Sequence, residues 1–202
     1  MIAIIDYGVG NLFSLSSSLA HLGLETVITS DADTLRRADQ IILPGVGAFA
    51  DAAAKLRRTG LVEVIKEQAA AGKPLLGICL GMQMLFDKSY EYGEHEGLGL
   101  IPGIIAPLKE DIPAELKVPH IGWNRLDIKK EDPLLKNLSG GEYVYYVHSF
   151  YAKNCPDAVL AESEYGTAVP GVVRCGSVWG CQFHPEKSGA VGLSILKAFS
   201  EL

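Results

Sequence analysis

The stretch PLLGICLGMQMLF, residues 74–86, decides the fold of this chain. The apolar run from Pro74 to Ile78 is typical of a buried strand, and the residues from Leu80 to Phe86 have helical character. Cys79 stands between these two segments, with a glycine nearby on either side. A strand that turns sharply into a helix through one nucleophile is a nucleophile elbow, and the glycines leave the space that such a crowded turn needs.

This position favours reactivity at Cys79, because the turn exposes the sulfur and the helix N-terminus stabilises a thiolate. Partners for the thiol occur in the segment VWGCQFHPE, residues 178–186. His184 is a candidate base and Glu186 a candidate residue to orient it. Pro185 favours an extended chain, in which side chains two residues apart face the same way. The sequence therefore predicts a cysteine, histidine and carboxylate triad.

Apolar strands alternate with helices through the first half of the chain, which favours a parallel sheet covered by helices on both faces. We expect an α/β, flavodoxin-like fold with an open, mostly parallel central sheet, and extra antiparallel strands in the second half. Residues 1–202 are expected to form a single domain. The expected strands are 2–5, 25–29, 41–43, 74–78, 103–108, 118–123, 142–147, 158–163, 172–175 and 177–183, and the expected helices are 12–22, 48–58, 61–71, 80–86 and 191–199.

Composition excludes several functional classes. The net charge of −6 and pI of about 5.4 argue against a general nucleic-acid binder. No apolar run approaches the roughly 20 residues that span a bilayer, and the N-terminus lacks the features of a signal peptide, so we expect a cytoplasmic protein without a membrane segment. The 4 cysteines have neither zinc-site nor disulfide-framework spacing, and we expect no metal or organic cofactor.

Attack of a thiol on a carbonyl needs backbone N–H donors for the oxyanion. The N–H of Leu80, next to the nucleophile, is the natural first donor. The segment Pro44-Gly45-Val46-Gly47 follows a buried strand and is the candidate for the second, with an ordinary Pro-Gly turn as the alternative. Gly8-Val9-Gly10 occupies a similar place, but Phe13 breaks the dinucleotide-binding pattern, which indicates a tight loop.

Other polar residues are expected to have ordinary roles. His21, His95 and His120 are interpreted as structural or solvated, and the charged run at 129–132 as a solvated turn. His148 follows an aromatic strand and is a candidate for lining a cleft.

The motifs GICLGMQ and HPE, at residues 77–83 and 184–186, resemble those of the class I (triad) glutamine amidotransferases. Further motifs are similar to those of family members that serve histidine biosynthesis, and the resemblance covers essentially the whole chain in order. These motifs are DYGVGN at 6–11, PGVGAF at 44–49, YVHSF at 146–150 and QFHPEKS at 182–188.

The resemblance implies hydrolysis of L-glutamine to L-glutamate and ammonia through a cysteinyl thioester. In such a reaction Cys79 attacks the amide, His184 moves the proton and Glu186 orients His184. By the same resemblance Leu80 and Val46 supply the oxyanion N–H groups. The substrate-binding positions that it implies are Gly47, Gln83, Glu91, His148, Ser149 and Phe150.

The resemblance also implies a partner, because ammonia is protonated in bulk water and must be passed on directly. The expected partner is a (β/α)8-barrel cyclase, bound in a heterodimer, that switches the glutaminase on. A peptide flip in residues 44–47 is the candidate switch. Asn11, Trp123 and Lys187 are the candidate interface residues.

Three alternatives remain open at this point. A glutaminase subunit that serves pyridoxal phosphate or anthranilate synthesis would carry the same triad. A cysteine peptidase or chaperone of related fold would release no ammonia from glutamine. A non-catalytic binding subunit would not need a complete triad.

Overall fold

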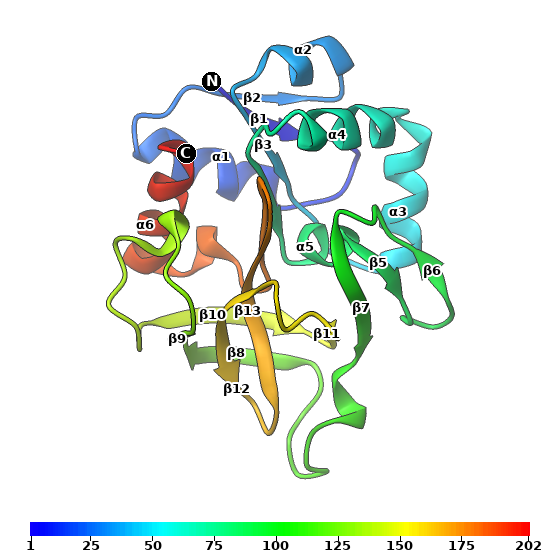
Figure 1. The fold of residues 1–202 in the computed structure, drawn as a ribbon, viewed down its shortest axis with the longest axis vertical. Coiled ribbons are helices and arrows are strands. Elements are labelled where there is room, and N and C mark those ends of the chain that lie inside the picture. The colour runs from blue at the N-terminus through cyan, green and yellow to red at the C-terminus, as the bar shows by residue number, and fades with distance from the viewer.

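The computed structural model describes residues 1–202 and is built around a mixed sheet of 8 strands (Figure 1). Its strands are β1 (Ile2–Ile5), β2 (Thr26–Thr29), β3 (Gln40–Leu43), β4 (Leu75–Ile78), β9 (Asp127–Ile128), β12 (Val159–Glu164), β13 (Ala168–Cys175) and β14 (Val178–Cys181). They lie in the order β2-β1-β3-β4-β14-β13-β12-β9. Neighbours from β2 to β14 are parallel, and those from β14 to β9 are antiparallel.

Helices cover both faces of this sheet, which confirms the predicted fold class. They are α1 (Leu12–His21), α2 (Ala32–Arg37), α3 (Phe49–Arg58), α4 (Leu61–Ala70), α5 (Leu80–Met84) and α6 (Gly189–Ser200). Alternate residues of β1 enter the two hydrophobic cores: Ile4 packs in the core that contains residues of α1 and α6, whereas Ile5 packs in the core that contains residues of α2 to α5. Strands buried on both faces explain the continuous apolar runs in the sequence.

Two smaller sheets contain the remaining strands, of which those expected at 103–108, 118–123 and 142–147 are confirmed, whereas those at 86–89, 95–96 and 150–153 were not predicted. One contains β5 (Phe86–Ser89), β6 (His95–Glu96), β7 (Ile101–Pro107) and β11 (Phe150–Lys153), and the other pairs β8 (His120–Arg125) with β10 (Tyr143–His148). These strands lie at the lower and right side of Figure 1, beyond the helices. Short 3-10 helices complete the elements, namely η1 (Leu108–Glu110), η2 (Pro133–Leu135) and η3 (Pro185–Lys187).

The helix after the elbow is shorter than the sequence predicts. It ends at Met84, and Phe86 begins β5. The Met84 carbonyl accepts a hydrogen bond from the N–H of Leu98, and the Leu85 carbonyl accepts from Leu100. The segment before β7 therefore satisfies carbonyl groups that a further helical turn would have used.

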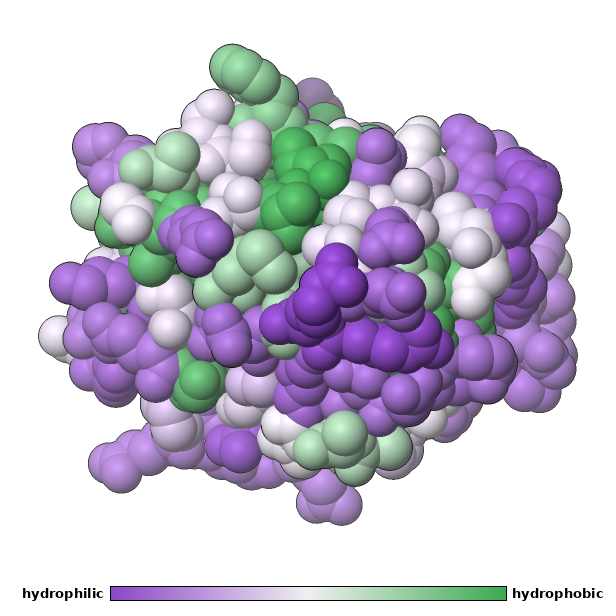
Figure 2. Space-filling model, turned by 90° about the horizontal axis from the view of Figure 1, so that it is seen from above, coloured by the Kyte–Doolittle hydropathy of each residue, from purple (hydrophilic) through white to green (hydrophobic).

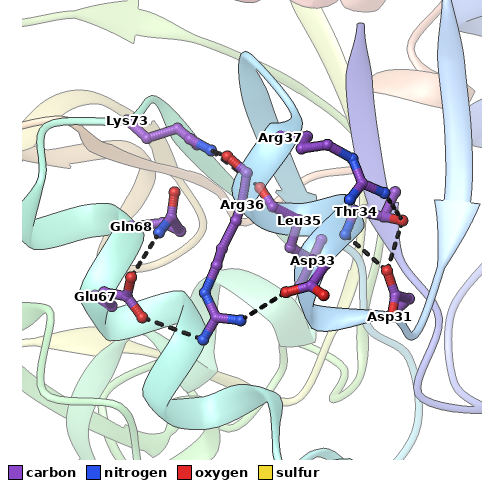
Figure 3. A network of polar contacts seen from close by, with 9 residues as sticks. All are labelled: Asp31, Asp33, Thr34, Leu35, Arg36, Arg37, Glu67, Gln68 and Lys73. Atoms are coloured by element: carbon purple, nitrogen blue, oxygen red, sulfur yellow. Dashed lines mark hydrogen bonds and ion pairs between the residues drawn. The ribbon is translucent and has the colours of Figure 1, made fainter.

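Helix α2 is an element that the sequence analysis missed, and side chains fix both of its ends. Asp31 caps its N-terminus by accepting a hydrogen bond from the Thr34 N–H at 2.7 Å. Arg36 reaches both Asp33 and Glu67, and the Lys73 ammonium donates to the Arg36 carbonyl at 2.7 Å (Figure 3). These contacts join α2 to α4 and to the turn before β4.

The end of the molecule that carries α2 and α4 is mainly hydrophilic, with hydrophobic residues in separate patches (Figure 2). No helix of the structure has the length and apolar character required to cross a membrane.

The interpretation of residues 129–132 as a solvated turn is wrong for Asp132, which is buried. Its carboxylate accepts hydrogen bonds from Trp179 Nε1 at 3.0 Å and from the Leu134 N–H at 2.8 Å, and it pairs with Arg174 at 2.7 Å. A buried carboxylate needs such partners, so Asp132 is an internal anchor between η2 and the central sheet.

Candidate active site

Cys79 occupies a strained turn between β4 and α5. Its φ of 54° and ψ of −112° are unusual for a residue with a side chain. The Cys79 N–H still donates to the Cys181 carbonyl at 2.7 Å, so β14 holds the start of the turn. A Cβ at Gly81 would lie 1.9 Å from the Leu43 carbonyl oxygen, which explains the glycine two residues after Cys79.

His184 and Glu186 lie at the end of β14 and are joined by a direct contact. Nδ1 of His184 is 2.8 Å from Oε1 of Glu186, and each side chain is 3% exposed. The extended conformation predicted for the whole segment holds at His184 but is wrong from Pro185 to Lys187, which form η3. The Lys187 N–H donates to the His184 carbonyl at 3.0 Å, and this short turn brings the carboxylate back to the imidazole.

The pKa of His184 reflects two opposing influences. Burial lowers this pKa, but hydrogen bonds and charge interactions with Cys79 and Glu186 outweigh burial and raise it to about 9. Because a carboxylate only accepts, Nδ1 of His184 carries the proton that faces Glu186, and Nε2 is left for the thiol of Cys79. The surroundings thus favour an imidazolium beside the sulfur, which suits a thiolate nucleophile.

Cys79 and His184 line one cavity of about 390 Å³. The cavity also contains Val46 and Leu80, the predicted oxyanion donors. Every residue predicted to bind substrate lines it as well, namely Gly47, Gln83, Glu91, His148, Ser149 and Phe150. Segments far apart in the sequence therefore meet at one place, although their roles in catalysis and binding remain predictions.

Glu91 is placed to present a carboxylate at this cavity. It accepts a hydrogen bond from the Phe49 N–H at 2.6 Å, at the first residue of α3. Its partial burial raises the pKa of Glu91, while the bond from Phe49 and the charge of His95 lower it. A half-buried carboxylate at a cavity wall is a suitable partner for an ammonium group.

Gln83 connects the elbow helix to the opposite wall of the cavity. Its amide nitrogen donates to the Phe150 carbonyl at 2.9 Å and to Oε1 of Gln182 at 3.0 Å. The amide nitrogen of Gln182 in turn lies 4.0 Å from the Cys79 sulfur. The sequence analysis did not single out Gln182, although its position two residues before His184 was the available signal.

The backbone of the Pro44–Gly47 segment is held by two hydrogen bonds. The Leu80 N–H donates to the Gly45 carbonyl at 3.3 Å, and the Tyr7 hydroxyl donates to the Pro44 carbonyl at 2.7 Å. The predicted oxyanion donor at Leu80 is therefore engaged in this structure. Tyr7 is a further residue that the sequence analysis missed, although it belongs to the DYGVGN motif.

The candidate interface residues lie around the site rather than together. Lys187 is exposed and lines the cavity that contains Cys79. Asn11 lines a small space together with His184 and Glu186. Trp123 is 53% exposed on β8 and lines neither of these two spaces. Their contacts with a partner remain predictions.

Comparison with known proteins agrees with this architecture. Residues 3–200 match the family described as glutamine amidotransferase class-I, and the chain belongs to this family. The chain is 54% identical to the imidazole glycerol phosphate synthase subunit HisH of Listeria monocytogenes, over 100% of this chain and 96% of the relative. The subunit HisH of Caldanaerobacter subterraneus is 51% identical, over 100% of this chain and 98% of the relative.

A solved structure shows the same fold at low sequence identity. The structure of PurLQS from Thermotoga maritima has a TM-score of 0.77 and 21% identity, and the match covers 99% of this chain and 97% of that one.

Proposed function

We propose that the chain is the glutaminase subunit of an imidazole glycerol phosphate synthase and acts in histidine biosynthesis. It hydrolyses L-glutamine to L-glutamate and ammonia. The observation that carries the proposal is the meeting of Cys79 and His184 in one cavity, with Glu186 bonded to the far nitrogen of the imidazole. Residues 1–202 act as one glutamine amidotransferase domain, and the proposed location is the cytoplasm.

In the first half of the reaction, the Cys79 thiolate attacks the carbon of the glutamine side-chain amide. The His184 imidazolium then gives its proton to the departing nitrogen, so that ammonia leaves and a thioester remains. In the second half, His184 takes a proton from water as the water oxygen attacks the thioester carbon. Cleavage of the carbon–sulfur bond releases glutamate and restores the thiolate and imidazolium.

The cavity walls supply the groups that hold glutamine. The carboxylate of Glu91 binds the α-ammonium group, while Gln83, Gly47 and the segment from His148 to Phe150 hold the remaining polar groups. The proposed oxyanion donors are the N–H groups of Val46 and Leu80. Because the Leu80 N–H donates to Gly45 here, catalysis requires a shift of the Pro44–Gly47 segment.

A cyclase partner provides the reason for such a shift. We assign it the (β/α)8-barrel form, in a heterodimer that receives ammonia before it is protonated and makes imidazole glycerol phosphate. Binding of the cyclase favours a conformation of the Pro44–Gly47 segment in which the Leu80 N–H is free, over the conformation seen here. Asn11, Trp123 and Lys187 are the proposed contacts with this partner.

The test measures ammonia released from glutamine with and without the ligand-bound cyclase. We expect strong stimulation by the cyclase, and loss of activity in Cys79→Ala. The matched control is Cys175→Ala, because Cys175 is a free, exposed cysteine distant in sequence from the elbow. Activity that survives in Cys79→Ala would refute the nucleophile, and a pull-down of a different synthase would refute the proposed partner.

A further inference from the structure

Two buried histidines beside the cavity form a continuous polar chain. Nδ1 of His148 lies 2.9 Å from the Phe150 carbonyl oxygen, and Nε2 of His148 lies 2.9 Å from Nδ1 of His120. Nε2 of His120 lies 2.7 Å from Oδ1 of Asn124. His120 is fully buried, so of the two interpretations given for it, structural or solvated, the solvated one is wrong.

Both ends of this chain can only accept hydrogen bonds. A backbone carbonyl such as that of Phe150 has no proton to donate. The orientation of the Asn124 amide is set on its other side, where Nδ2 donates to the Glu164 carbonyl at 3.0 Å. Turning the amide over would place two oxygens against each other, so Oδ1 of Asn124 faces His120 as an acceptor.

A count of protons follows from these fixed ends. Each contact in the chain needs one proton, which makes three for the contacts at Phe150, between the two rings, and at Asn124. Two neutral imidazoles carry only one ring N–H each. A neutral pair would leave one contact without a proton, whereas a pair with one positive charge satisfies all of them.

The surroundings decide which ring holds the charge. Tyr165 and Tyr146 stack on His120, with ring centroids 3.8 Å and 4.9 Å away and interplanar angles of 17° and 21°. The negative face of an aromatic ring attracts a cation that lies over it, so the two tyrosine rings stabilise a positive charge on His120. Burial lowers the pKa of His148 to about 3, and the charges of His120 and His184 lower it as well, so His148 is the neutral ring.

Other groups around His120 oppose or support a charge there. Burial lowers the pKa of His120 below its ordinary value, and the hydrogen bond to Asn124 offsets only part of this effect, so burial opposes a charge on the ring. Burial raises the pKa of Tyr146, so this stacked ring keeps its proton. The Tyr165 hydroxyl donates to the Lys117 carbonyl at 2.8 Å. A buried hydrogen-bonding group left without a partner destabilises the fold, and this cost adds to the stacking in favour of the charged form.

We propose that His120 is an imidazolium clamped between Tyr146 and Tyr165, and that it positions His148 for substrate binding. As a cation His120 donates from both nitrogens, which forces His148 to accept at Nε2 and donate from Nδ1 to Phe150. The Phe150 carbonyl also accepts from Gln83, so the wall of the cavity is held from two sides. Only the effect on glutamine binding rests on the proposed function.

Nitrogen-15 NMR of the full chain with labelled histidine tests the protonation directly, without any assay of activity. The chain has 5 histidines, and the signals of the pair are assigned by their loss in His120→Gln and His148→Gln. At pH 7 we expect His120 to carry protons on both nitrogens and His148 to be neutral with its proton on Nδ1. A neutral His120, or a His148 protonated on Nε2, would overturn the proposal.

Substitutions at Tyr165 test the clamp. Tyr165→Leu removes a stacked ring, and we expect it to move the loss of the His120 charge to lower pH by at least one unit. Tyr165→Phe is the matched control, since it keeps the ring and loses only the hydroxyl bond to Lys117. Equal titration of His120 in the two variants would refute the role of stacking.

Kinetics of the complex with the cyclase test the positioning role. We expect His120→Gln to raise the KM for glutamine about tenfold and to change kcat by less than twofold, because His120 does not touch the reacting atoms. Retention of the wild-type KM would refute the positioning role even if the NMR result held. If the wild-type complex released no ammonia, the proposed function would fail, while the NMR result would still decide the charge on His120.

Discussion

The carbonyl oxygen of Gly45 accepts a hydrogen bond from the N–H of Leu80 at 3.3 Å, so the backbone donor next to Cys79 is engaged by the chain itself. Gly45 lies close to the elbow because it has no side chain, since a Cβ there would come within 2.6 Å of the Gly81 nitrogen. In this conformation the Leu80 N–H is therefore not free to bind an oxyanion.

The Tyr7 hydroxyl stabilises this conformation of the Pro44–Gly47 segment by donating to the Pro44 carbonyl. Burial raises the pKa of Tyr7, as does the nearby Cys79 to a smaller extent, so the hydroxyl keeps its proton. We expect Tyr7→Phe to raise the glutaminase rate without the cyclase several-fold, because one buried bond contributes about 1 kcal/mol. Ammonia release with and without the cyclase measures this effect. Tyr151→Phe, which loses a hydroxyl bond to Asp111, is the control. Equal rates of Tyr7→Phe and the wild type without the cyclase would contradict a role of Tyr7 in restraining the segment.

The raised pKa of His184 predicts how stability depends on pH. The pKa is about 9 in the folded protein and about 6.5 in the unfolded chain. The imidazolium therefore contributes stability that is complete below pH ~6.5 and is lost as the pH rises through 9. In urea unfolding from pH 6.5 to 9.5, we expect the wild type to lose on the order of 1–3 kcal/mol more than Glu186→Gln. Parallel pH curves would show that Glu186 does not hold the imidazolium.

The charge of Glu91 is predicted to govern affinity for glutamine. Glu91→Gln keeps an acceptor for the Phe49 N–H but removes the negative charge at the cavity. We expect the KM for glutamine to rise at least tenfold, because a charge-assisted bond to the α-ammonium contributes about 1.5–3 kcal/mol. The control is Glu94→Gln, which breaks an exposed pair with Lys88. An unchanged KM in Glu91→Gln would assign the ammonium to another group.

Gly81 is predicted to be essential to the elbow for steric reasons. The Cβ of Gly81→Ala would meet the Leu43 carbonyl at 1.9 Å, and this backbone atom belongs to the central strand β3. We expect the free energy of unfolding to fall by about 3 kcal/mol or more. Gly60→Ala is the matched control, because the site has open space and a φ of 73°, so that only backbone strain of about 1–2 kcal/mol applies. Similar losses in the two variants would contradict the steric explanation.

Local patterns predicted the main parallel strands and the long helices, because their apolar runs and helical spacing are independent of distant contacts. Helix α2 was not predicted, because six residues are too few to show a helical spacing of apolar residues. Its ends depend on contacts with Asp31 and Lys73. The predicted helix extends to Phe86, the first residue of β5, and the rest of this strand was not predicted, because its start depends on pairing with β7. The burial of Asp132 could not be predicted locally either, because its partners Trp179 and Arg174 lie far along the chain.

The sequence by itself determined the elbow and the chemical groups available for catalysis. Glycines close to Cys79 and the proline after His184 restrict or permit conformations of the backbone next to them, which is a local effect. The tertiary structure decided where those groups meet. β14 pairs in parallel with β4 so that Cys181 lies opposite Ile78, and this register brings His184 to the edge where Cys79 emerges. The engaged N–H of Leu80 and the hydrogen bond between His120 and His148 likewise depend on contacts between distant segments, which no local pattern of residues encodes.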